Sequence, residues 1–164
     1  MHITIFVYGT WGDIRPHVVL GMALQKAGHQ GQVVASPGYE HWVRDRNLGY
    51  YPLSADVNTF ARENADLMDM GFISQLQTLR TRIAPIFTQM GLEVMAATRS
   101  SDVLMTVEFG ASLLLDVIKV NKLKPIFVNP APINPTRESN TVLPALPGWF
   151  PFEGWYNRLR YSVL

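Results

Sequence analysis

An aspartate near the N-terminus stands where a protein can place a general base. Asp13 follows the run Gly-Thr-Trp-Gly at residues 9–12, and that run follows a stretch of apolar and β-branched residues. The stretch predicts a buried strand, and we expect the next helix to begin at Pro16, because proline suits a first helical turn. Open α/β sheets bind ligands at such strand-to-helix turns. Asp13 is therefore either a helix cap or a catalytic carboxylate.

The loop around this aspartate has the composition of a phosphate-binding turn. Gly9 and Gly12 are expected to allow a sharp turn and a close approach of the backbone to a ligand. Together with Thr10 they are our candidates for contact with a donor's phosphates, since a helix N-terminus favours anions. Trp11 and His17 are candidate contacts for an acceptor molecule. For both of them, packing within the protein is the alternative interpretation.

A second loop is expected at the same edge of the sheet. Glu108 and Phe109 follow the fourth predicted strand, so we consider both as acceptor contacts. A solvated turn residue and a packing aromatic are the alternatives. The absence of cysteine excludes disulfides, thiolate zinc sites and cysteine nucleophiles, and the four histidines form no metal-binding pattern. The dinucleotide fingerprint, the P-loop and the nucleophile elbow are all missing.

The elements that must position these residues alternate along the chain. This order predicts a three-layer, Rossmann-like α/β domain with a mostly parallel sheet of five or more strands. Between residues 58 and 101 no strand is expected, and we predict a break near Gly71 and a kink at Pro85. The expected strands are 3–7, 32–36, 49–53, 102–107 and 125–129, and the main expected helices are 16–27, 39–46, 74–99 and 110–121.

Composition limits the classes of function. A chain of 164 residues is expected to form one domain with a proper core. A net charge of +1 without a basic block argues against a nucleic-acid partner. No apolar run reaches the length of a membrane span, and the N-terminus lacks the basic region of a signal peptide. We therefore expect an intracellular, cytoplasmic protein.

Residues 9–17, which read Gly-Thr-Trp-Gly-Asp-Ile-Arg-Pro-His, carry a family resemblance. They resemble the first loop of two-domain, twin-Rossmann (GT-B) glycosyltransferases of families 1 and 28, above all sterol and lipid glucosyltransferases and antibiotic glycosyltransferases. Ala27-Gly28-His29, Ser36-Pro37 and the Trp- and Pro-rich tail fit the same family.

The resemblance implies a reaction and a catalytic residue. It implies inverting transfer of a hexose from a nucleotide sugar, expected to be a UDP-sugar, to a hydroxyl of a lipophilic acceptor, with Asp13 as general base and without a metal or other cofactor. In the related plant and animal enzymes a histidine replaces this aspartate, and an aspartate after the fourth strand orients it. Here Val107 and Glu108 stand at that point, so we expect Asp13 to act alone.

The family holds its sugar nucleotide mainly in a C-terminal domain, which nothing in this chain matches. We therefore expect residues 1–164 to be the acceptor-binding half, inactive alone. The proline-rich segment 130–151 predicts an ordered apolar loop that contacts the missing domain, a second copy of the chain or a membrane surface, unless it folds back on its own core. The alternative functions are a non-catalytic Rossmann-like module that binds a lipophilic ligand or partner, and a flavin- or nucleotide-binding domain.

Overall fold

A five-stranded parallel sheet forms the centre of the fold, in the order β3-β2-β1-β4-β5. The computed structural model describes residues 1–63, 65, 71–107 and 114–129, and the contacts group Met1–Val128 into one compact unit. The predicted fold class, a three-layer α/β domain with a parallel sheet, is confirmed. The strands are β1 (His2–Phe6), β2 (Gln30–Ala35), β3 (Gly49–Pro52), β4 (Val103–Thr106) and β5 (Lys124–Phe127).

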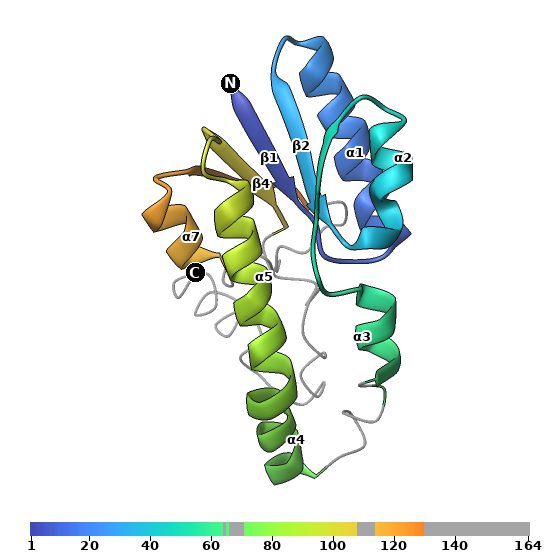
Figure 1. Ribbon diagram of the computed structural model, residues 1–164, viewed down its shortest axis with the longest axis vertical. Helices are drawn as coiled ribbons and strands as arrows, with labels where there is room; N and C mark the ends of the chain where they lie inside the picture. Colours follow the sequence, from blue (N-terminus) through green and yellow to red (C-terminus); the bar gives the residue numbers. More distant parts are fainter. Residues whose placement is uncertain (64, 66–70, 108–113, 130–164) are drawn as a thin grey trace, which may run out of the picture. The chain divides into compact units, whose positions relative to one another are not determined.

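Helices cover both faces of this sheet (Figure 1). The helices α1 and α2 lie on one face, and α5 and α7 lie on the other. A 3₁₀-helix, η1, precedes α2, and a π-helix, η3, precedes α5. The bounds are α1 (Trp11–Lys26), η1 (Pro37–Tyr39), α2 (Glu40–Arg44), α3 (Val57–Glu63), α4 (Phe72–Thr78), η3 (Leu79–Ile83), α5 (Ala84–Ala97) and α7 (Leu115–Val120).

The central strand β1 supplies side chains to two separate cores. Ile3 and Ile5 belong to the core under α1 and α2, whereas Phe6 belongs to the core under α5 and α7. Successive side chains of a strand point to opposite faces, and both faces of a parallel sheet are covered by helices. β1 therefore places apolar side chains on both of its faces, as expected for a buried strand.

The first helix begins earlier than expected. The sequence predicted a start at Pro16, but α1 begins at Trp11 and contains Pro16 in its second turn. Thr10 and Asp13 form a capping box, which fixes the helix start upstream of the proline. Pro16 has no N–H to donate to the carbonyl of Gly12, which is a small loss near a helix end. At the other end Gly28 has φ +86°, the expected left-handed position after the helix.

The long helix predicted for residues 74–99 is broken in the structure. A π-helix over Leu79–Ile83 joins α4 to α5. It ends two residues before Pro85, which lies in the first turn of α5. Proline lacks the N–H that a continuous helix needs, so the irregular turn falls where the sequence predicted a kink.

Several predictions fall on residues that the structure does not describe. Glu108, Phe109, the proline-rich segment 130–151 and the helix expected at 153–164 lie outside the described residues. Within the described residues, every helix is too short or too polar to cross a bilayer.

Candidate functional site

The loop between β1 and α1 is held in place from two sides. Beyond the end of β1, the Val7 amide donates to the Val34 carbonyl at 3.0 Å. The Tyr39 hydroxyl donates to the Gly9 carbonyl at 3.1 Å. The loop therefore sits at the carboxyl edge of the sheet, next to its central strand, with a backbone fixed by its neighbours.

Asp13 is anchored through one carboxylate oxygen. Its Oδ2 accepts the Thr10 amide at 2.8 Å and the Thr10 hydroxyl at 3.2 Å. Within the described part of the chain, no hydrogen bond reaches Oδ1, and the side chain is only partly buried. One oxygen thus fixes the rotamer of Asp13 and the other is open to a substrate. The N-cap itself is Thr10 and not Asp13, so the two interpretations of Asp13 are compatible.

The two glycines of the loop differ in what surrounds them. A Cβ placed on Gly9 would lie 2.3 Å from Asp13 Oδ2, whereas one on Gly12 would meet, among the described residues, only the Thr10 hydroxyl oxygen, at 3.7 Å. Neither glycine has a positive φ. The loop therefore does not use the left-handed backbone conformation that makes glycine suitable for a sharp turn. Gly9 is required because the Asp13 carboxylate lies against its backbone.

The phosphate-binding role of Gly9, Thr10 and Gly12 stays a prediction. The Thr10 amide, one of the groups that a phosphate would use, donates to Asp13 in this structure. The carboxylate also supplies the negative charge that the N-terminus of α1 favours.

Trp11 packs toward α2. Its ring meets Tyr39 edge-on with centroids 4.8 Å apart and Trp42 with centroids 5.3 Å apart. The Arg15 guanidinium lies 5.2 Å from the centroid of the Trp11 ring. Trp11 remains 42% exposed, so part of its surface is available to a ligand.

His17 is fully buried and joins α1 to the end of β5. Its Nδ1 lies 2.6 Å from the Asp13 carbonyl oxygen, and its Nε2 lies 3.0 Å from the Val128 carbonyl oxygen. A neutral imidazole carries one N–H and donates to one of these oxygens, whereas the imidazolium donates to both. The ring thus contacts Asp13 through the backbone carbonyl, and the role of His17 as an acceptor contact stays a prediction.

We expect His17→Phe to lower the free energy of unfolding by about 1–3 kcal/mol, because phenylalanine fills the space but leaves a buried carbonyl without its donor. Urea denaturation monitored by circular dichroism measures this loss. His41→Phe is the matched control: His41 is exposed, and its replacement should change stability by less than about 0.5 kcal/mol. Equal effects of the two substitutions would show that the carbonyl contacts of His17 contribute nothing.

An aromatic cluster on the other face of the sheet was not predicted from the sequence. Tyr8 makes edge-on contacts with Phe60 of α3 and Phe87 of α5, each with ring centroids 6.4 Å apart. Phe60 and Phe87 contact each other at 6.1 Å. The one signal in the sequence was a tyrosine directly before Gly9, at the end of a buried strand.

A surface pocket of about 410 Å³ opens beside this cluster. Asp56 and Phe60 contribute to it from one side, and Ile86 and Gln89 of α5 from the other. One helical turn after Gln89, the Glu93 carboxylate accepts a hydrogen bond from the Ser54 amide at 3.0 Å. Burial raises the pKa of the Glu93 carboxyl, but the hydrogen bonds from Ser54 and Gln89 outweigh it and leave the pKa below its ordinary value.

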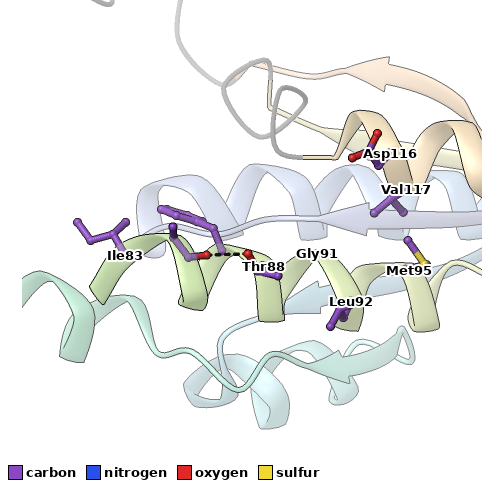
Figure 2. A pocket seen from close by; sticks show the side chains of 9 residues that line it. Ile83, Thr88, Gly91, Leu92, Met95, Asp116 and Val117 are labelled. Carbon is purple, nitrogen blue, oxygen red and sulfur yellow. Dashed lines mark hydrogen bonds between the residues drawn. The ribbon is translucent and has the colours of Figure 1, made fainter. Parts of the chain in front are cut away.

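A second pocket, of about 590 Å³, lies between α5 and α7 (Figure 2). Ile83, Leu92 and Met95 line it from the α5 side, and Asp116 and Val117 from α7. The lining is mostly apolar, and none of the predicted site residues that the structure describes contributes to it.

Comparisons with known proteins place this geometry in context. No protein-family model matches the chain. A stretch of 53 residues is 32% identical to the sterol 3-beta-glucosyltransferase of Pichia angusta, covering 32% of this chain and 4% of the relative. The chain thus spans a small part of the curated relatives that it matches.

Solved structures agree on the fold. The glycosyltransferase of kitacinnamycin superposes with a TM-score of 0.56 at 15% identity, over 99% of this chain and 34% of its own. The Streptomyces sp. SF2575 glycosyltransferase SsfS6, complexed with thymidine diphosphate, has a TM-score of 0.55 at 21% identity, over 77% of this chain and 38% of its own. The chain therefore has the fold of the N-terminal domain of a GT-B glycosyltransferase, and part of its sequence is similar to sterol glucosyltransferases.

Proposed function

We propose that this chain is the acceptor-binding half of an inverting glycosyltransferase with Asp13 as general base. The observation that carries the proposal is the Asp13 carboxylate at the carboxyl edge of the sheet, with Oδ2 held by Thr10 and Oδ1 open. The sequence relatives are sterol glucosyltransferases, which supports a lipophilic alcohol as the acceptor.

The proposed reaction is a single displacement. The acceptor oxygen attacks the anomeric carbon of the sugar, and Asp13 Oδ1 takes the proton from that oxygen as the new bond forms. The nucleoside diphosphate leaves with the electrons of the broken bond, and the anomeric configuration is inverted. Trp11, Glu108 and Phe109 remain proposed acceptor contacts.

We assign the donor to a second domain. The structural neighbour SsfS6 was solved with thymidine diphosphate and is much longer than this chain. We propose that a nucleotide sugar, in this case a UDP-sugar, binds mainly to such a domain without a metal ion. The cytoplasmic surface of a membrane is the proposed location, because a lipophilic acceptor is concentrated there.

The test is a transfer assay with a protein that joins this chain to a donor-binding domain. Incubation with UDP-glucose and a 3β-hydroxysterol should give a steryl glucoside, which mass spectrometry detects. The 164-residue chain alone should neither transfer nor hydrolyse the sugar. Failure of the joined protein to glycosylate sterols or other lipophilic alcohols would refute the proposal, and turnover by the chain alone would refute the division between two domains.

A further inference from the structure

Tyr39 contacts the loop that carries Asp13 from another part of the chain. It is the last residue of η1, shortly after β2, and it is only 3% exposed. Its hydroxyl donates to the Gly9 carbonyl at 3.1 Å, and its ring meets the Trp11 ring edge-on with centroids 4.8 Å apart. One buried side chain therefore contacts both the backbone of the loop and its aromatic residue.

The turn that carries Tyr39 is itself held in place. Pro37 begins η1, and proline restricts the backbone there. The Tyr39 amide donates to the Ser36 carbonyl at 3.2 Å, and the same carbonyl accepts the buried Tyr50 hydroxyl. The Tyr39 ring belongs to the core under α1 and α2. Because its backbone and its ring are both fixed, Tyr39 places its hydroxyl at a defined point.

The Gly9 carbonyl leads directly to the carboxylate of Asp13. This carbonyl and the Thr10 N–H belong to one planar peptide group, and in a trans peptide they point in opposite directions. The carbonyl accepts Tyr39 on one side, and the N–H donates to Asp13 Oδ2 at 2.8 Å on the other. Hydrogen bonds in such a chain also polarise one another. Fixing the carbonyl therefore fixes the donor that orients the carboxylate.

We propose that Tyr39 is a positioning residue for Asp13. Its hydroxyl holds the peptide group between Gly9 and Thr10, so that Oδ2 stays bonded and Oδ1 stays directed at the acceptor, and Tyr39 itself does not touch a substrate. This proposal rests on the proposed function only for the role of Asp13 as general base. The first measurement below needs no sugar transfer, so a failed transfer assay leaves the positioning testable, and a failed positioning test does not affect the transfer assay.

The first measurement is hydrogen exchange of the Thr10 amide in the full chain, followed by NMR. Tyr39→Phe keeps the ring and removes the hydroxyl, so this amide should exchange roughly fivefold to tenfold faster, the usual contribution of one hydrogen bond. Thr98→Val is the matched control: it removes a buried hydroxyl that donates to the Val94 carbonyl at 2.7 Å, just before β4, and should leave Thr10 exchange unchanged. An unchanged rate in Tyr39→Phe, or an equal rise in Thr98→Val, would overturn the proposal.

The second measurement is steady-state kinetics of a protein that joins this chain to a donor-binding domain. Tyr39→Phe should lower kcat roughly fivefold to tenfold and leave the KM for the sugar nucleotide unchanged, because the donor is assigned to the other domain. In an Asp13→Asn background the same substitution should have no further effect on kcat, since Tyr39 acts through Asp13. An equal loss in both backgrounds would show that Tyr39 acts independently of Asp13, and the proposal would be wrong.

Discussion

Asp13→Asn should lower kcat by roughly 10²–10⁴-fold in a protein that contains this chain and a donor-binding domain, which is the usual contribution of a general base. Asparagine keeps the shape of the side chain and an oxygen that can accept the Thr10 amide. It cannot take a proton from an acceptor hydroxyl. Steady-state rates with saturating donor and acceptor measure the effect, and stability should fall by no more than about 1 kcal/mol from the lost charge at the N-terminus of α1.

Asp102→Asn is the matched control for this substitution. The Asp102 carboxylate also accepts a backbone amide, that of His2 at 2.8 Å, but it lies at the amino end of β1, on the opposite edge of the sheet. Its replacement should leave kcat near the unaltered value. Near-normal turnover of Asp13→Asn would reduce Asp13 to its role in the capping box.

Gly9→Ala should lower kcat/KM by about 100-fold or more in the same two-domain protein. The new methyl group would lie 2.3 Å from Asp13 Oδ2 and 2.9 Å from Asp13 Cβ, so the carboxylate must move. A displacement of about 1 Å in a catalytic group costs on the order of 100-fold in rate. The capping box should weaken too, and the loss of stability on urea denaturation reports that part separately.

Gly12→Ala separates this effect from a general intolerance of the loop. A methyl group there would lie 3.7 Å from the Thr10 hydroxyl oxygen, an ordinary contact distance, and alanine suits a helix better than glycine does. We expect stability to be kept or improved and kcat/KM to stay within severalfold. If the two variants lose activity equally, the loss comes from crowding of a ligand and not from the displaced carboxylate.

The fold could be predicted because its signals are local. Five short apolar segments alternate with helical ones, and only a parallel sheet with crossover helices accommodates that order. The residues at which helices begin are harder to predict. Pro16 predicts a helix start at residue 16, but the capping box of Thr10 and Asp13 makes α1 begin five residues earlier, at Trp11. Nothing about Pro16 by itself reveals which signal is stronger.

The candidate site was predictable only in part, for a related reason. Asp13 and Gly9 stand close together in the sequence, so their shared loop could be recognised. The cluster of Tyr8, Phe60 and Phe87 brings together three segments that are far apart in the chain. Whether a hydroxyl finds a partner depends on how those segments pack, and no single segment contains that information.

The place of β1 at the centre of the sheet also sets the order in which the protein can fold as it is synthesised. Ile3 lies beside Gly31 on one side and Val103 on the other. The nascent chain can therefore form β1, β2 and β3 soon after they leave the ribosome, whereas β4 and α5 arrive much later. Until then the side of β1 that carries Phe6 is uncovered, and such transiently exposed apolar surface is where a folding chain is prone to aggregate.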